Sequence, residues 1–519
     1  MLPSKPWSRC SYAGYPTRFS LQMTAASEHV VVAGAGICGL LSALSLSKRG
    51  FGVTLLERDA APPPGGPDAA FFEWQRPGAA QFRHPHALLG LLCNLLEKHH
   101  PELLDELYAA GARRLPFLDM LPHTLREHYE PEAGDESLWI LLCRRATIEA
   151  ALWRFVAQRS NIHIRNGTQV TGLLTSGSTA PVVVDGLRIA DAHGEHELRA
   201  DVTLDASGRR SRFPRWLAEL GAAVHEERTD AEIVYYTRHY RLRPGASEPR
   251  RDAPGARSGA GDLGYLKFGV FPGDAGHFAI ILCVPLVERE LRRAVRDARQ
   301  FDAICRNIPG LAPWLACGQA DPTTEPFGIA DIRAVWRSYV RDGQPVALNL
   351  FAVGDSAIRT NPLYGRGCSM GMLHSQLLVD TLCEQHAPNA RALQFQRRTD
   401  AQLRSFFDLS LREDKRGIRR ALALQQTAPA QPRPGLRQWL RDSFGDAVSA
   451  AARKELSVAR GAFRTFHLLE PPGQFLKQWP VRTQVLRYLL RGRRRNLAER
   501  LPPGPDRLTL HAALGISAE

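Results

Sequence analysis

A glycine-rich run near the start of the chain constrains the fold more than any other feature. The segment VVVAGAGICGLLSALSLSKRG begins at Val30 and carries the pattern G-x-G-x-x-G at Gly34, Gly36 and Gly39. The first glycine permits a tight turn, the second lets backbone approach a pyrophosphate, and the third lets a helix pack close to a strand. The sequence therefore predicts a strand, a turn and a helix whose N-terminus faces phosphate groups.

An acidic residue closes the strand that is predicted next. Residues Val53 to Glu57 form this strand, which ends 23 residues after Gly34. The Glu57 carboxylate is well placed to accept hydrogen bonds from ribose hydroxyls, and the adjacent Arg58 is a further candidate for the nucleotide site. The order of strand, helix, strand and acid favours a site for NAD or FAD over a membrane span in the uncharged residues 30–47.

A second glycine-rich segment, more than three hundred residues later, favours FAD. Residues 350–383, LFAVGDSAIRTNPLYGRGCSMGMLHSQLLVDTLC, are similar to the GD motif and following helix of p-hydroxybenzoate-hydroxylase-type flavoproteins. The resemblance implies that Asp355 binds the ribityl chain. It also implies that the glycine loop and helix start face the flavin pyrimidine edge, where a helix N-terminus stabilises negative charge. The cofactor-binding residues implied in this segment are Gly354, Asp355, Pro362, Gly365 and Gly367.

Two more motifs resemble the same superfamily. CRRATIEAAL, residues 143–152, resembles its RxxLExxL helix, which implies that Arg145 meets the FAD pyrophosphate, with Arg144 as the alternative. Val170, in a predicted strand, resembles the position whose backbone contacts adenine.

The segment DASGRRSRFPRWL, residues 205–217, resembles the place where other members carry DGxxSxxR. Here Ser207-Gly208 replaces Asp-Gly, which argues against direct handling of NAD(P)H by this motif. This version is similar to the branch that contains flavin halogenases, polyketide epoxidases and prenyl reductases.

A more specific resemblance lies in RPGAAQFRHPHALLGLLCNLL, residues 76–96. It is similar to a GxPQxRHxHxLL stretch of bacterial FAD-dependent oxidoreductases near the polyether-type epoxidases. The resemblance places this loop by the flavin, where Arg83 would pair a phosphate or the flavin and His86 would shape the pocket; helix-start packing is the alternative. Arg366 stands where many relatives carry Gln, so it is either a cation near the reduced flavin or a solvated surface residue.

The remaining composition adds exclusions. The 519 residues carry a formal charge of +14, much of it from arginine, which resembles the drift of a GC-rich coding sequence, so we expect no nucleic-acid partner. Nine scattered cysteines include no CxxC pair and no zinc spacing, which predicts reduced thiols, a cytoplasmic location and no metal site. Cys368 is either a flavin attachment point or a small buried filler, and His374 either packs in the core or takes part in function.

The sequence predicts an α/β fold with a glutathione-reductase-type Rossmann FAD-binding domain. A mixed β-sheet substrate domain is expected to be interleaved with it, followed by a helical C-terminal region. The expected boundaries are an unstructured extension at 1–27, the FAD-binding domain at 28–225 and 345–395, the substrate domain at 226–344, and the helical region at 396–519.

The resemblance implies a flavin monooxygenase that hydroxylates or epoxidises a hydrophobic, natural-product-like substrate through a flavin C4a-hydroperoxide. O2 would be the co-substrate, and NAD(P)H or a reductase partner the electron donor; no general acid or base is evident. The alternatives are a flavin reductase or dehydrogenase of a prenyl-like substrate and a flavin-binding membrane-surface scaffold without turnover. Halogenation is disfavoured because a WxWxIP motif is absent.

Two further regions of the sequence each allow two interpretations. Aromatic side chains on the expected substrate sheet line an apolar pocket or belong to the core; they are Tyr235, Tyr236, His239 and Phe268. A segment with Leu486, Leu489 and Leu490 beside clustered arginines is a solvated basic helix by default, or it lies on an anionic membrane surface.

Overall fold

A parallel sheet lies at the centre of the computed structural model, which describes residues 28–177, 181–251, 256–425, 435–498 and 502–516. The strand order is β22-β10-β1-β2-β6, and every pairing is parallel. The carboxyl ends of the strands therefore meet at one edge, which is where open α/β sheets bind ligands. The strands are β1 (His29–Ala33), β2 (Gly52–Leu56), β6 (Ile162–Arg165), β10 (Val202–Asp205) and β22 (Leu350–Ala352). The expected extension, 1–27, lies outside the described residues.

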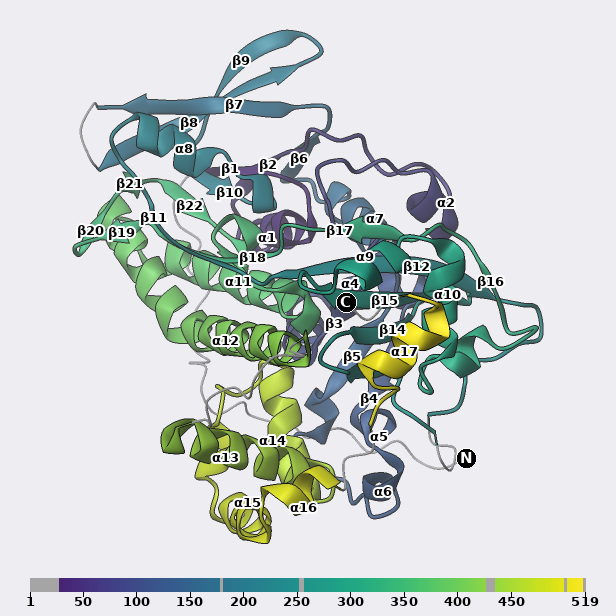
Figure 1. The fold of residues 1–519 in the computed structure, drawn as a ribbon. Helices are drawn as coiled ribbons and strands as arrows, with labels where there is room; N and C mark the ends of the chain where they lie inside the picture. Colours follow the sequence, from purple (N-terminus) through teal and green to yellow (C-terminus); the bar gives the residue numbers. More distant parts are fainter. Residues whose placement is uncertain (1–27, 178–180, 252–255, 426–434, 499–501, 517–519) are drawn as a thin grey trace, which may run out of the picture.

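Different layers cover the two faces of this sheet (Figure 1). Val30 and Val32 of β1 point into the core beneath the helices, whereas Val31 and Ala33 point into the core beneath a second, mainly antiparallel sheet. This alternation, with apolar residues on both sides, is typical of a parallel strand buried on both faces. The helices are α1 (Ile37–Ser47), α7 (Arg145–Ala157) and α11 (Gly367–Glu384); the second sheet contains β7 (Gln169–Ser176), β8 (Val182–Asp191), β9 (Gly194–Arg199) and β21 (Ala347–Leu348).

A larger antiparallel sheet faces the carboxyl edge of the parallel sheet. Its longest pairing joins β12 to β15, and α17 returns from the C-terminus to pack on it, with Leu510 in the same core as Phe278. The sheet contains β12 (Ile233–Leu242), β13 (Ala260–Asp262), β14 (Lys267–Pro272), β15 (His277–Pro285), β16 (Ala320–Pro322) and β17 (Phe327–Ile329). The helices on it are α9 (Arg289–Ala294), α10 (Ala298–Arg306) and α17 (Arg507–Leu514). A three-stranded sheet beside it contains β11 (His225–Asp230), β18 (Arg333–Ser338) and β23 (Ile358–Arg359).

The helical C-terminal region divides into parts with different neighbours. The 38-residue α12 (Pro388–Gln425) runs along α11 and buries Phe395, Leu403 and Phe407 in the central core. The next helices form a bundle with its own small core, at the end of the molecule away from β7–β9 (Figure 1). A buried Arg460, 2.9 Å from Asp135, ties this bundle to the rest of the chain. The bundle helices are α13 (Leu436–Ala452), α14 (Leu456–Phe466), α15 (Trp479–Arg491) and α16 (Arg493–Ala498).

The structure confirms the predicted fold class and adds elements that the sequence reading missed. Residues 60–70, AAPPPGGPDAA, have the Pro/Gly composition of a loop, but α2 (Pro67–Phe72) begins inside them, because Pro67 suits a first helical turn and Phe71 is buried. Some strands of two to four residues were also missed, since they are too short to show a period. The missed strands are β3 (Ala87–Leu88), β4 (Arg113–Pro116), β5 (Trp139–Leu142), β19 (Val340–Arg341) and β20 (Gln344–Pro345). The helices of the fold not yet given are α3 (Gly90–His99), α4 (Pro101–Ala109), α5 (Phe117–Met120), α6 (His123–Arg126) and α8 (Phe213–Glu219).

Two absences hold for the described ranges. The eight cysteines in them are free, and no group of His, Cys, Asp and Glu side chains there is arranged to hold a metal ion. None of the described helices combines the length and apolar character needed to cross a bilayer.

Buried histidines predict that acid destabilises this fold. Burial lowers the pKa of His374 to about 3, whereas an unfolded histidine titrates near 6.5. Below pH 6.5 the unfolded chain therefore binds a proton that the folded chain does not bind. The free energy of unfolding then falls by about 1.4 kcal/mol per pH unit for each such residue.

We expect His374→Gln to make the free energy of unfolding less dependent on pH between neutral pH and pH 4. The slope should decrease by the contribution of one buried histidine. Urea unfolding at successive pH values measures this slope. His386→Gln is the control, because His386 is exposed and should leave the slope unchanged. An unaltered slope in the His374 variant would contradict the assignment.

Candidate functional site

The two glycine-rich segments are in contact at the carboxyl edge of the parallel sheet. Cys38 of α1 packs between Gly354, which follows β22, and Gly371 of α11. A Cβ added at Gly354 would lie 2.7 Å from the Cys38 sulfur. Segments 320 residues apart therefore build one edge.

The turn after β1 leaves the start of α1 open. Gly34 has a φ of +107°, and its N–H donates to the Leu56 carbonyl at 2.8 Å. A Cβ on Gly39 would overlap the carbonyl oxygen of Gly34, so only glycine fits there. Gly36 is different, because it has no neighbour within 4 Å of an added Cβ and no side chain caps the helix that follows it. The free N–H groups of a helix start suit an anion.

Glu57 lies at the end of β2 with its carboxylate buried. It accepts hydrogen bonds from the backbone N–H of Ala35 at 2.9 Å, the N–H of Asp59 at 3.0 Å and the guanidinium of Arg76 at 3.0 Å. Arg58 is half-exposed and lies 3.8 Å from the Asp59 carboxylate.

Val170 lies in β7, next to this turn. The N–H of Thr168, just before β7, donates to the Glu57 carbonyl at 2.9 Å. The backbone position predicted to contact adenine is therefore two residues from one that is hydrogen-bonded to Glu57, the residue predicted to bind ribose.

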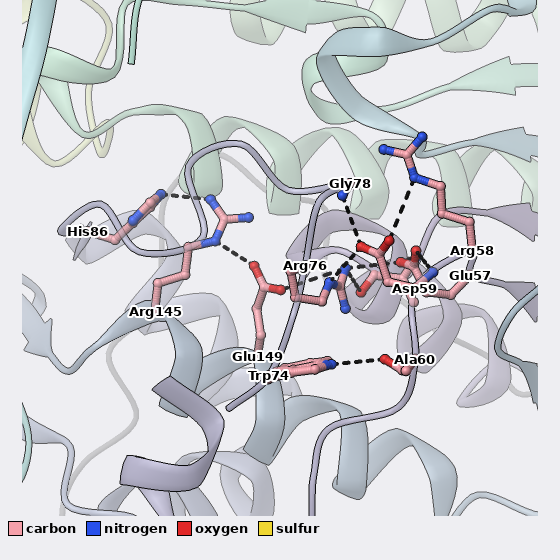
Figure 2. Close-up of polar contacts among 11 residues, drawn as sticks. Glu57, Arg58, Asp59, Ala60, Trp74, Arg76, Gly78, His86, Arg145 and Glu149 are labelled. Atoms are coloured by element: carbon pink, nitrogen blue, oxygen red, sulfur yellow. Dashed lines mark hydrogen bonds and ion pairs between the residues drawn. The ribbon is translucent and has the colours of Figure 1, made fainter. Parts of the chain in front are cut away.

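Arg76 is the site residue that the sequence reading missed (Figure 2). Its buried guanidinium lies 3.0 Å from Glu57, 3.4 Å from Asp59 and 3.8 Å from Glu149, and it donates to the Ala35 carbonyl at 3.2 Å. Its Nη1 atom finds no acceptor within the described part of the chain. A buried donor beside the glycine turn therefore remains for an anion. Arg76 opens the RPGAAQFRHPHALL motif, and this was the only sequence signal for it.

Arg145 and His86 form the other end of the same charged row (Figure 2). Arg145 donates to Glu149 at 2.5 Å and to Nε2 of His86 at 2.9 Å. Since arginine is always a donor, His86 carries its proton on Nδ1, which lies 2.8 Å from the His84 carbonyl. Burial and the charge of Arg145 hold the pKa of His86 well below its usual value, so His86 is neutral.

The two alternatives at the start of α7 have different partners. Arg144 turns toward the turn between β14 and β15, where it donates to Asp274 at 2.7 and 3.0 Å; it also lies 2.7 Å from Asp68. Arg145, not Arg144, is the one that lies in the row with Arg76 and His86.

Arg83 does not lie in this row. Its Nε donates to the carbonyl of Phe71 at 3.1 Å, at the end of α2. The histidines around it form bonds that fix the loop to β12: His84 Nδ1 lies 2.8 Å from Thr237 Oγ1, and His239 Nε2 lies 2.7 Å from the Arg83 carbonyl.

The turn after β22 places Asp355 opposite the 76–86 loop. Gly354 has a φ of +59°, and the Asp355 carboxylate accepts from Gln81 Nε2 at 3.2 Å. Ser356 accepts from the N–H of Gly208 at 2.8 Å, which joins this turn to the DASGRRS segment. Asp205 of that segment is buried and bonded to its own neighbours, Ser207 and Ser211, which gives it a structural part in the turn.

The NPLYGRG loop opens α11 and leans on α12. Pro362 and Gly367 are exposed, and Gly365 has a φ of +66°. Arg366 is 3% exposed, so the solvated alternative is wrong. Its guanidinium lies 2.7 Å from Glu413 of α12, because the buried charge needs a carboxylate partner.

Asp414, the next residue of α12, holds the same loop. Its carboxylate accepts from the Asn361 side-chain amide at 2.6 Å and from the Tyr364 hydroxyl at 2.9 Å. Asn361 in turn accepts from the Tyr235 hydroxyl of β12. Burial raises the pKa of Asp414. No local sequence pattern marks Glu413 or Asp414.

A cavity lies between the 82–86 loop, the start of α7 and the antiparallel sheet. Its lining includes His84, His86, Arg145, His239, Phe271 and Phe278. Burial lowers the pKa of His84 to about 4 and that of His239 to about 3, so both are neutral at neutral pH.

The aromatic candidates on β12 and β14 divide between two places. Tyr235 and His239 contact the loops of the site, whereas Phe268 packs in the core beneath α9, α10 and α17, with Tyr236 against that core. His374 is buried and stacks on Phe395 of α12 at 4.8 Å, away from the loops. Burial raises the pKa of the Cys368 thiol to about 11, which favours its protonated form at neutral pH.

Comparisons with known proteins agree with this geometry. Residues 29–240 match the family model described as FAD dependent oxidoreductase. "Protein Rv3254" of Mycobacterium tuberculosis is 26% identical over 379 residues, which cover 67% of this chain and 71% of that protein.

Solved structures share the fold at identities too low to transfer activity. PqsL, a probable FAD-dependent monooxygenase from Pseudomonas aeruginosa, is 16% identical and covers 77% of this chain and 99% of its own, with a TM-score of 0.55. PnpA, p-nitrophenol 4-monooxygenase from Pseudomonas putida DLL-E4, is 17% identical and covers 86% and 99%, with a TM-score of 0.55. The flavin-dependent brominase Bmp2 is 14% identical and covers 90% and 100%, with a TM-score of 0.58.

Family match and fold together agree with the resemblance: residues 29–240 match a family model of FAD-dependent oxidoreductases, and the chain shares the fold of structures described as flavin-dependent monooxygenases.

Proposed function

We propose that this protein is an FAD-dependent monooxygenase that hydroxylates or epoxidises a hydrophobic, natural-product-like small molecule. The observation that carries the proposal is the contact between the Gly34 turn and the Gly354-Asp355 turn, with a cavity beside it under the antiparallel sheet. Such an edge suits a long cofactor that spans both turns. PqsL and PnpA, which share the fold, are described as monooxygenases, and this supports the reaction type.

The residues present fit FAD. The open space at Gly36 and the uncapped start of α1 suit the diphosphate, and the free Nη1 of Arg76 offers it a buried donor. We assign Glu57 to the ribose hydroxyls, Asp355 to the ribityl chain, and Arg145 to the phosphate.

At the flavin end, the residues of this chain would position the cofactor and take no chemical part in the reaction. We assign Pro362, Gly365 and Gly367 to the pyrimidine edge of the flavin, where an exposed glycine at the start of α11 lets a flat ring approach the helix N-terminus. Bound and reduced, FAD supplies the activation of O2, with electrons from NAD(P)H or a reductase partner.

We place the substrate near the small cavity under the antiparallel sheet, which is lined by the 82–86 loop and would have to widen to admit it. Its neutral histidines and aromatic side chains suit an apolar part of the substrate. Arg83, Arg144 and Arg145 also line it, and they suit a polar or anionic group. Enclosure between the sheet and the loop would exclude water from the reacting atoms.

Oxygen transfer is the test of the reaction type. The purified protein should show flavin absorbance bands at roughly 370 and 450 nm. With isotope-labelled O2 and a panel of apolar aromatic and prenyl-type compounds, product mass spectra should show one labelled oxygen atom. A product without label would contradict the monooxygenase and favour a reductase or dehydrogenase, and absent flavin bands would contradict the cofactor.

Two glycines of the turn should separate binding from folding. Gly36→Ala puts a methyl group into the space assigned to the phosphate, so we expect FAD affinity to fall about tenfold or more, with the melting temperature of the apoprotein unchanged. Gly39→Ala should lower the stability of the apoprotein by about 1–3 kcal/mol or more, because its methyl group overlaps the Gly34 carbonyl.

Flavin titration and thermal unfolding of the apoprotein measure the two effects. Gly52→Ala is the matched control, since an added Cβ there meets nothing within 4 Å and β2 is extended. Equal FAD affinity in wild type and Gly36→Ala would refute the phosphate assignment.

Asp414 should matter more than a neighbouring acid on the same helix. Asp414→Ala leaves the buried Asn361 amide and Tyr364 hydroxyl without their acceptor, so we expect a loss of about 1–3 kcal/mol in unfolding free energy and a shifted flavin spectrum. Asp408→Ala removes only the partly exposed pair with Arg404 and should cost about 1 kcal/mol or less. Similar losses of unfolding free energy in the two variants would argue against the assigned role of Asp414 in holding the NPLYGRG loop.

A further inference from the structure

The α13–α16 bundle concentrates exposed apolar side chains. Of the fifteen large hydrophobic residues that are exposed in the described chain, nine lie between residues 435 and 498. A scatter of single exposed residues is normal on a protein surface, whereas a local concentration marks an interaction site.

On α13 these side chains form a stripe. Leu436, Trp439, Leu440 and Phe444 stand at positions i, i+3, i+4 and i+8, which is one face of a helix, and their exposed fractions are 72%, 46%, 52% and 42%. Farther along the same face, Ala447, Ala450 and Ala451 fill the core of the bundle, and none of the four stripe residues belongs to that core. The stripe therefore lies beyond the part of α13 that packs in the bundle core.

On α15, exposed apolar side chains form a second stripe along one face of the helix. Trp479, Leu486 and Leu490 stand at i, i+7 and i+11, and they are 72%, 51% and 79% exposed. Val481 and Val485 face the bundle core instead. A tryptophan with a leucine pair on one face is typical of helices that lie in a membrane interface.

The same segment carries most of the excess charge of the chain. Residues 435–498 contain thirteen Lys and Arg against four Asp and Glu, an excess of nine, and the whole chain has +14. Exposed arginines flank both stripes, among them Arg437, Arg441, Arg482 and Arg487. Positive charge beside apolar side chains matches the chemistry of an anionic lipid surface, which offers phosphates above and acyl chains below.

We propose that the exposed stripes of α13 and α15 dock the protein on an anionic lipid bilayer, lying in the interface without crossing it. The apolar side chains enter the boundary between headgroups and acyl chains, and the flanking arginines contact lipid phosphates. The bundle lies at the end of the molecule away from β7–β9 (Figure 1), so docking leaves the sheets of the fold free. This inference does not depend on the reaction that the flavin site performs.

Vesicle flotation with the full chain tests the proposal. The protein should float with phosphatidylcholine vesicles that contain phosphatidylglycerol, and not with pure phosphatidylcholine. Binding should fall about tenfold or more when salt is raised from about 0.1 M to about 1 M, because the Debye length shrinks. Absence of binding to the anionic vesicles at low salt, or equal binding to both vesicle types, would overturn the proposal.

Surface variants localise the contact. The double variant Leu486→Ser, Leu490→Ser should weaken flotation about tenfold or more, with an unchanged melting temperature because both side chains are exposed. Leu508→Ser is the matched control, as it is 64% exposed but lies on α17, outside the bundle.

Arg482→Gln with Arg487→Gln should weaken binding to anionic vesicles in the same way. Size-exclusion chromatography with light scattering tests whether a second copy of the chain covers this face instead of lipid. A dimer that the double leucine variant converts to a monomer would show that it does, and would contradict the proposal. Unchanged flotation of the double leucine variant would also contradict the proposal.

Discussion

The buried charges of Arg76 and Arg145 set the conditions that the carboxyl edge of the parallel sheet must satisfy. A guanidinium taken out of water costs several kcal/mol unless carboxylates and hydrogen bonds compensate it. Here Glu57, Asp59 and Glu149 do so, and they come from the end of β2, the loop after it and α7. Pairing therefore fixes these three elements relative to one another. One donor of Arg76 is left over beside the glycine turn, so the same network that holds the edge together also presents it to an anion.

A second set of contacts brings distant parts of the chain to this edge. Arg144 binds Asp274 and so fastens the antiparallel sheet to the start of α7, next to the residue that enters the charged row. Glu413 and Asp414 fasten the NPLYGRG loop to α12. Asn361 of this loop also accepts a hydrogen bond from a tyrosine of β12. The NPLYGRG loop therefore contacts both α12 and the antiparallel sheet, and it leads into α11. The position of that loop thus depends on a helix that no nucleotide motif includes.

What could be predicted from the sequence follows from how local each requirement is. The glycines of the first turn reflect a close approach within a few residues, so their spacing alone indicated strand, turn and helix. The family resemblance supplied the later loop. Arg76 and Asp414 gave no comparable signal, because their partners lie on other elements. An arginine or an aspartate in a sequence does not by itself show whether its side chain is buried or exposed. Arg366 shows the limit most clearly: in the sequence it stands between two glycines like a surface residue, and only the approach of Glu413 from α12 makes it a buried ion.

The distribution of charge separates the two ends of the molecule. At the sheet edge the arginines are matched by nearby carboxylates, which limits the field that they project. Residues 435–498 contain thirteen basic and four acidic residues, so nine of the fourteen excess charges of the chain lie there. Of these basic residues, Arg460 is matched by Asp135 outside the bundle. An excess of this kind attracts an anionic surface over about a Debye length, roughly 10 Å, and orients the molecule before any apolar contact forms. The apolar stripes of α13 and α15 lie among these charges, so the side chains that electrostatics brings to the surface first are also those that can enter it.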